Sequence, residues 1–69
     1  MDKTTKQIIV KIKLLRLKNN MTQSELAIKA GLNPNSYAKI ERGERSPSVK
    51  TIEKLAKVLG VKSSDIFPF

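Results

Sequence analysis

The stretch TQSELAIKAGLNPNSYAKIERG, residues 22–43, decides the fold of this chain. Thr22 and Glu25 match the T-x-x-E capping box, in which each side chain accepts a hydrogen bond from the other residue's backbone amide. Gly31 ends this helix after about two turns, because glycine readily adopts the left-handed conformation of a helix terminus. The small residue Ala27 lets a following helix cross closely. The pattern therefore predicts a short helix followed by a tight turn.

A second short helix follows the turn. Asn33 is suited to cap it, and Pro34 is suited to its first helical position. The helix is expected to run to about Arg42, and Gly43 stops it. Two short helices around a glycine turn form the helix-turn-helix arrangement, whose second helix can enter a DNA major groove about 12 Å wide. The inward-facing residues of this second helix are expected to be Tyr37, Ile40 and Glu41.

Residues 5–18 are predicted to form a helix before this unit. Apolar side chains recur there at intervals of four and three residues, which places them on one face of a helix. Asn19 and Asn20 then end the helix, because asparagine tolerates the left-handed conformation. Residues 1–4 are expected to be a frayed terminus. The apolar residues of the inner stripe are Ile8, Ile12 and Leu15.

The residues after the unit predict one longer helix and a last turn. The polar segment 44–47 is expected to be a loop, after which Ser48 caps a helix that Gly60 ends. Ser63 is expected to cap a short turn that ends at Phe67. No segment alternates with a period of two, so the sequence predicts an all-α domain of five helices. The apolar residues at helical spacing in the longer helix are Val49, Ile52, Leu55, Ala56 and Leu59.

The composition bounds the possible functions. The chain has 69 residues, the length of one domain, and a formal net charge of +8, which favours a polyanionic partner. It contains no cysteine and no histidine, which argues against disulfides, structural zinc and histidine-based catalysis. A second domain for ligand sensing or catalysis does not fit this length, and the acidic residues are scattered with no pair in a cleft. We therefore expect no enzyme, no cofactor and no small-molecule ligand. The acidic residues in question are Glu25, Glu44, Glu53 and Asp65.

The N-terminal apolar residues do not resemble a signal peptide, since Lys6, Lys11 and Lys13 interrupt them. No uncharged stretch approaches the roughly 18 residues needed to cross a membrane. The sequence therefore predicts a cytoplasmic protein without a membrane partner.

Several motifs, in their order and spacing, resemble one known family. They are TQSELA at 22–27, AGL at 30–32, IERG at 40–43 and PS at 47–48. Together they are similar to the lambdoid phage repressor and Cro helix-turn-helix family, also called XRE-like, over nearly the whole chain. The resemblance implies a compact five-helix, lambda-repressor-like domain with the helix-turn-helix in helices two and three. It also implies a sequence-specific transcriptional regulator that binds inverted-repeat operators on double-stranded DNA.

The resemblance also assigns DNA contacts to residues of this chain. The helix from Asn33 to Arg42 is similar to the family's recognition helix. Gln23 corresponds to a position whose side chain and backbone amide meet a phosphate. The positions implied to face base edges are Asn33, Pro34, Asn35 and Lys39, and those implied to lie near the DNA backbone are Thr22, Gln23, Ser36, Arg42 and Arg45.

Two of these residues also suit base recognition by their own chemistry. Asn35 can bind N6 and N7 of adenine, and Lys39, one turn further on the same face, can donate to O6 and N7 of guanine. Pro34 offers only an apolar contact where many family members have a polar residue. Asn33 has a structural alternative as a helix cap, and Arg42 has one as a solvated cation at a helix C-terminus.

Arg16 and Glu41 form a separate pair. In the family that the chain resembles, the equivalent positions carry an ion pair that ties the first helix to the recognition helix. The pair is therefore expected to hold the architecture rather than to contact DNA.

Two apolar sets exceed what a small core requires. At about 100° per residue, Val10, Leu14 and Leu17 lie together on the first helix, nearly opposite its inner stripe. They either pack against the C-terminal tail or form a surface for a protein partner. In the tail, Ile66 and Phe67 are expected to close the core. The residues of a hypothesised homodimer interface are Val58, Val61 and Phe69.

Three classes of function remain open at this point. The leading one is a DNA-binding transcriptional regulator that acts as a homodimer. The second is an antitoxin-type interaction protein that also represses its own operon, which the extra apolar stripe on the first helix motivates. The third is an architectural or RNA-binding protein, which predicts affinity independent of sequence.

Overall fold

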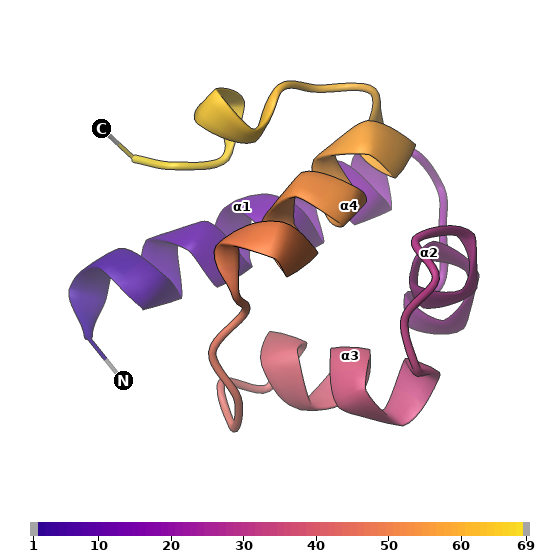
Figure 1. Cartoon of the computed structure of the whole chain (residues 1–69), viewed down its shortest axis with the longest axis horizontal. Helices are drawn as coiled ribbons and strands as arrows, with labels where there is room; N and C mark the ends of the chain where they lie inside the picture. The colour runs from indigo at the N-terminus through magenta and orange to yellow at the C-terminus, as the bar shows by residue number, and fades with distance from the viewer. Residues whose placement is uncertain (1, 69) are drawn as a thin grey trace.

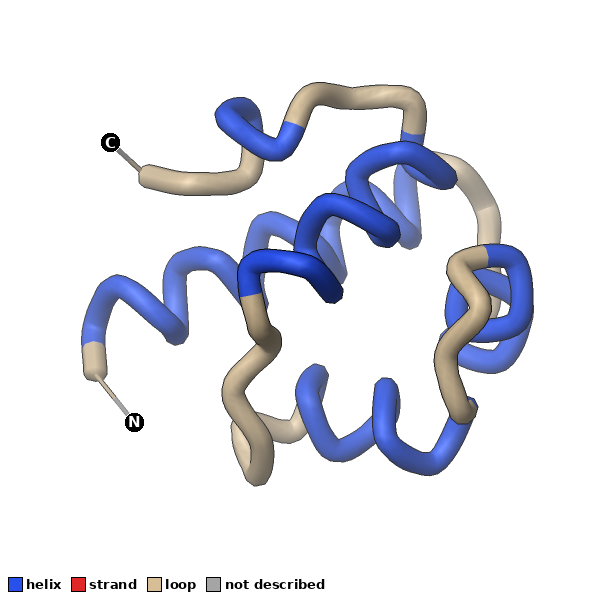
Figure 2. The backbone as a smooth tube through the Cα atoms, in the orientation of Figure 1, coloured by secondary structure: helices blue, strands red, loops and turns tan. Residues whose placement is uncertain are grey.

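The structure is a computed structural model that describes residues 2–68, and every regular element in that range is helical. This confirms the all-α class, although the last of the five expected helices is only a single 3-10 turn. Figure 1 shows α2 at the right, seen nearly end-on, joined at the lower right to α3, with α4 crossing in front of α1; Figure 2 shows the short loops that join the helices. The elements are α1 (Lys3–Lys18), α2 (Gln23–Lys29), α3 (Pro34–Glu41), α4 (Val49–Leu59) and η1 (Ser63–Asp65).

Helix α1 begins earlier than the apolar periodicity of the sequence predicts. Asp2 caps it by accepting a hydrogen bond from the backbone amide of Thr5 at 2.7 Å, so residues 3 and 4 are helical and the expectation of a frayed segment is wrong for the described residues 2–4. The carboxylate also lies near the positive end of the helix dipole, which favours it there. The helix ends as expected at Asn19, and Asn20 takes a left-handed φ of 56°.

The caps of α2 and α3 follow the sequence. The capping box of α2 is complete, with the amide of Thr22 donating to Glu25 at 2.9 Å and the amide of Glu25 donating to Thr22 at 3.0 Å. Gly31 has a φ of +72°, and a methyl group added there would meet nothing within 4 Å. Glycine is therefore required at this turn by its backbone conformation and not by lack of space.

Two details of the C-terminal part differ from expectation. Val49 is 62% exposed, although its spacing placed it with the core residues of α4. It is the first residue of the helix, and because helical side chains tilt toward the N-terminus it leans past the end of α4. Ser63 does not cap the last turn; the amide of Lys62 donates instead to the carboxylate of Asp65 at 3.0 Å.

The core lies where α1 and α2 each pack against α3 and α4. Residues from every helix contribute, and Tyr37 at its centre is fully buried. Ile66 closes the core from the tail and Phe67 packs partly against it, as expected. Ile9 is also buried, although the sequence analysis did not place it in the inner stripe. The largest fully buried side chains are Tyr37, Ile12, Leu26, Leu55 and Ile66.

Candidate nucleic-acid interface

The turn between α2 and α3 is fixed by backbone hydrogen bonds. The amide of Leu32 donates to the carbonyl of Ala27 at 2.8 Å, and the amide of Gly31 donates to the carbonyl of Ile28 at 3.1 Å. Ala27 itself is fully buried. A methyl-sized side chain at this point lets the two helices approach closely, so the turn holds α3 at a set angle to α2.

Helix α3 has sharply different faces. Its inner face carries Tyr37 and Ile40, which are buried. Its outer face carries Asn35 and Lys39, which are exposed and four residues apart, so they lie one above the other. The N-cap is Asn33, whose Oδ1 accepts hydrogen bonds from the amides of the residues at positions 35 and 36 at 2.9 and 3.2 Å. The polar outer face is thus held rigidly by an apolar inner one.

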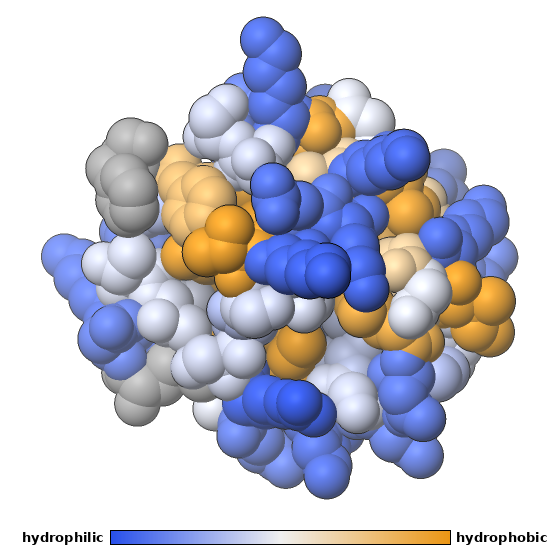
Figure 3. Space-filling model, viewed as in Figure 1, coloured by the Kyte–Doolittle hydropathy of each residue, from blue (hydrophilic) through white to orange (hydrophobic). Residues whose placement is uncertain are grey.

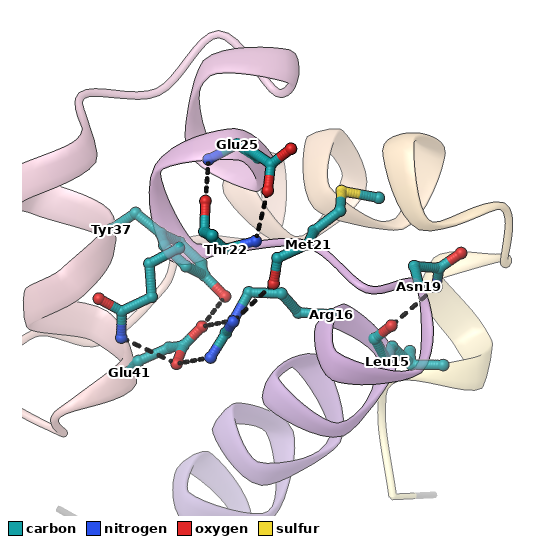
Figure 4. Close-up of polar contacts among 9 residues, drawn as sticks. Leu15, Arg16, Asn19, Met21, Thr22, Glu25, Tyr37 and Glu41 are labelled. Atoms are coloured by element: carbon teal, nitrogen blue, oxygen red, sulfur yellow. Dashed lines mark hydrogen bonds and ion pairs between the residues drawn. The ribbon is translucent and has the colours of Figure 1, made fainter.

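One carboxylate, that of Glu41, joins three helices (Figure 4). Arg16 on α1 donates from Nε to Oε2 at 2.6 Å and from Nη2 to Oε1 at 3.1 Å. Gln23 donates to Oε1 at 3.0 Å, and the hydroxyl of Tyr37 donates to Oε2. Arg16 also donates from Nη1 to the carbonyl of Met21 at 2.7 Å, which fixes the segment before α2. The structure therefore contains the expected ion pair and adds partners that the sequence analysis did not assign.

The burial of this cluster sets its electrostatics. The side chains of Arg16 and Glu41 are 9% and 3% exposed. Burial alone would raise the pKa of Glu41, but the hydrogen bonds from Arg16, Tyr37 and Gln23 outweigh it and lower that pKa below its ordinary value. The pKa of Tyr37 is raised by its burial and then by its hydrogen bond to the carboxylate. Glu41 is thus an ionised acceptor, and Tyr37 remains a neutral donor.

Gln23 was expected to meet a DNA phosphate with its side chain and its backbone amide. Its Nε2 donates a hydrogen bond to Glu41, and the side chain is half-buried. The backbone amide at this first position of α2 has no partner within its own helix, because the first amides of any helix lack one. The second Nε2 hydrogen and the main-chain amide are therefore the groups that Gln23 has left to donate.

The two arginines expected near the DNA backbone lie at the C-terminal end of α3 and in the loop that follows. Arg42 donates from Nε to Glu44 at 2.5 Å, with both side chains 54% exposed, so this surface pair is readily exchanged for another anion. Arg45 is exposed and, with Ser36, lines a cleft of about 290 Å³ beside the first residues of α4. Pro34 is half-buried and offers only part of its ring.

The two extra apolar sets differ in how much of their surface is exposed. Val10, Leu14 and Leu17 are 55%, 58% and 52% exposed, so the expectation that they pack against the tail is wrong for the described part of the tail. Val58 and Val61 pack partly against the core and keep some exposed surface. Phe69, the third residue of the hypothesised dimer interface, lies outside the described residues.

The surface seen in Figure 3 is dominated by hydrophilic side chains, with small apolar patches between them. Within residues 2–68, acidic side chains do not gather in the groups of three that could hold a metal ion. None of the helices described has the length and apolar character that crossing a membrane requires.

A capped pair of short helices, a glycine turn and an exposed polar face on the second helix define a helix-turn-helix DNA-binding transcriptional regulator. The chain belongs to the helix-turn-helix family HTH_3, whose model matches residues 12–66. This confirms the resemblance to phage repressor and Cro proteins that the sequence motifs indicated.

Individual relatives agree with this assignment. An uncharacterized HTH-type transcriptional regulator of Methanocaldococcus jannaschii, MJ0272, is 44% identical over 57 residues, which cover 83% of this chain and 86% of the relative. The control protein C.BamHI of Bacillus amyloliquefaciens is 42% identical over 60 residues, covering 86% and 74% of the two chains. The crystal structure of the wild-type restriction-modification controller protein C.Esp1396I superimposes with a TM-score of 0.88 at 30% identity, covering 96% of this chain and 85% of that one.

Proposed function

We propose that the protein binds an inverted-repeat operator on double-stranded DNA as a homodimer and reads it with the outer face of α3. The observation that carries this proposal is the pairing of Asn35 and Lys39 on one exposed face of a helix that is clamped from behind by Tyr37 and Glu41. A rigid helix with two donors one turn apart suits two neighbouring base edges in a major groove.

Specificity would come from these two side chains. Asn35 suits a two-point contact with adenine, and Lys39 suits O6 and N7 of guanine. Asn33 is committed to capping α3 through its Oδ1, so only its Nδ2 is left to donate to a base. Pro34 can add no more than an apolar contact, for example with a thymine methyl group.

Affinity would come mainly from contacts with phosphates. The net charge of +8 supplies a general attraction, and Arg42 and Arg45 stand at the end of α3, where they can reach the DNA backbone. At the start of α2, the phosphate contact would use Thr22 and the backbone amide of Gln23, because the N-terminus of a helix favours anions. Ser36 sits beside Arg45 along the cleft and can donate to the same strand.

A two-fold dimer would place two α3 helices about 34 Å apart, one turn of DNA. Val58 near the end of α4 and Val61 just after it each keep some exposed surface, and we include Phe69 in the same interface. Sedimentation of a chain shortened to end at Pro68 tests this. Weaker self-association than that of the full chain is expected, and equal self-association would remove Phe69 from the interface. A DNA ligand also favours the cytoplasmic location.

Selection of DNA from a random pool tests the central proposal. The full chain should enrich a consensus with two-fold symmetry and with half-sites one helical turn apart. An unsymmetrical consensus would contradict the dimer, and no consensus after repeated rounds would favour an architectural or RNA-binding protein instead. Binding of Asn35→Ala to the same pool provides the matched control, since that variant should lose preference at one position of each half-site.

A further inference from the structure

The exposed face of α1 carries apolar and basic residues in a regular arrangement. Val10, Leu14 and Leu17 form an apolar stripe, and each keeps more than half of its surface exposed. We call the stripe and the lysines beside it the α1 surface. At about 100° per residue, Lys6 and Lys13 fall on one side of the stripe and Lys11 and Lys18 on the other. These four lysines are exposed.

The charge of the α1 surface is of a single sign. Helix α1, with the sequence KTTKQIIVKIKLLRLK, contains no acidic residue. Its one arginine, Arg16, is turned inward and is neutralised by Glu41. The lysines of the α1 surface therefore face solvent around an apolar centre without an acidic residue of their own helix to balance them.

The surface is also hollowed at one end. Val10 and Leu14, with the stems of Lys3, Lys6 and Lys11, line a depression of about 340 Å³. Lysine side chains can cover apolar surface with their methylene groups while their charged ends stay in water. This shallow, open depression has an apolar floor and cationic edges, which suits apolar side chains that project from a partly acidic helix.

We propose that the α1 surface docks an acidic amphipathic helix of a partner protein. A second copy of this chain is a poor occupant, because two α1 helices would oppose lysine to lysine, and like charges across an interface cost binding free energy. An anionic membrane would match the charge, but three apolar side chains that are each only about half exposed offer little area to insert into it. Charge complementarity and the narrow apolar stripe thus favour a helix with apolar residues on one face and Asp or Glu beside them.

A titration followed by NMR tests the proposal with the full, ¹⁵N-labelled chain near physiological salt. The probe is a synthetic amphipathic helical peptide with leucines along one face and glutamates on both flanks. The control peptide has lysine in place of each glutamate. The acidic peptide should shift the amide signals of α1 and the control should not. Leu14→Asp should weaken binding at least about tenfold, because a buried leucine contributes strongly to an interface.

The matched control variant is Ile28→Asp. Ile28 is 67% exposed on α2, away from the α1 surface, so its replacement should leave the affinity for the acidic peptide unchanged. Both variants alter exposed positions and should keep the fold. If Leu14→Asp fails to fold, Lys11→Glu with Lys13→Glu tests the same surface through its charge and should also weaken binding.

Other results would overturn the proposal. Shifts confined to Asn35 and Lys39 would mean that the acidic peptide only mimics DNA on α3. Equal binding of the two peptides would remove the charge argument. Binding to phosphatidylglycerol vesicles without binding to the acidic peptide would make this surface a membrane contact. Self-association that Leu14→Asp abolishes would make it a contact between copies. None of these outcomes depends on whether the chain has an operator.

Discussion

Gln23 donates a hydrogen bond from Nε2 to Oε1 of Glu41 at 3.0 Å, which joins the first residue of α2 to the last residue of α3. The two helices meet at the glycine turn, and this bond links their far ends. The helix-turn-helix unit is therefore closed at both ends. Arg16, on α1, donates to the same carboxylate and so connects the helix-turn-helix unit to α1.

Replacement of Gln23 by alanine should destabilise the protein by about 1 kcal/mol, the usual net value of one hydrogen bond. Gln23→Glu should cost more, because it places a second carboxylate beside Glu41. Urea unfolding measures both. Ser24→Ala, at the exposed neighbouring position, is the control and should change little. Equal stability of Gln23→Ala and the parent chain would contradict a role for this bond in the fold.

Replacement of Glu41 by alanine should cost roughly 3–5 kcal/mol, because it leaves the buried guanidinium of Arg16 without its counter-ion. A domain this small has little stability to spare, so DNA binding should be lost with the fold. The matched control is Glu44→Ala, whose exposed pair with Arg42 should contribute little to stability. An unchanged melting temperature for Glu41→Ala would show that the pair does not hold the architecture.

The pKa of Glu41 predicts a dependence of stability on pH. Burial raises this pKa, yet the hydrogen bonds from Arg16, Tyr37 and Gln23 bring it below its ordinary value of 4.5. Because the folded pKa is the lower one, the stabilisation is complete above the unfolded pKa and is lost as pH falls through the folded pKa. The stability advantage over Glu41→Gln should therefore shrink as the solution is acidified below pH 4.5. Thermal unfolding of both chains across this range measures it; a constant difference would contradict the lowered pKa.

Lys39 and Arg45 should affect DNA binding in different ways. Lys39→Ala should reduce discrimination at one base pair by about 1–3 kcal/mol. Arg45→Ala should weaken all sequences alike and reduce the slope of log affinity against log salt by about 0.9. Lys62→Ala, in the loop before η1, is the control for loss of one positive charge. If Lys39→Ala and Arg45→Ala gave the same pattern, α3 would not be the element that reads the bases.

The local features of the fold were predictable from the sequence, because they depend on residues close to one another in the chain. The capping box of Thr22 and Glu25 and the left-handed turn at Gly31 are of this kind. The bond from Gln23 to Glu41 was missed because the partners are 18 positions apart and meet only when α2 crosses α3. A glutamine at the first turn of α2 gives no periodic signal for such a contact.

The wrong predictions for the start of α1 and for Val49 also have local physical causes. Aspartate followed by a helical run is a known start signal, so the cap at Asp2 was predictable. The prediction that Val49 lies in the core neglected the tilt of the first side chain of a helix toward the N-terminus. Periodicity separated the inner and outer stripes of α1, although it left out the buried Ile9. It could not decide between tail packing and exposure for Leu14, because that depends on the path of the tail.

The clamp behind α3 has a consequence for how such a protein can evolve. The groups that orient the helix, Tyr37 and Glu41, are buried, whereas Asn35 and Lys39 stand on its exposed outer face. Replacement of Asn35 or Lys39 by other residues should therefore alter the preferred DNA sequence with little effect on folding. Single substitutions on the outer face should therefore be enough to produce proteins with new DNA preferences, while the buried residues that hold α3 stay unchanged.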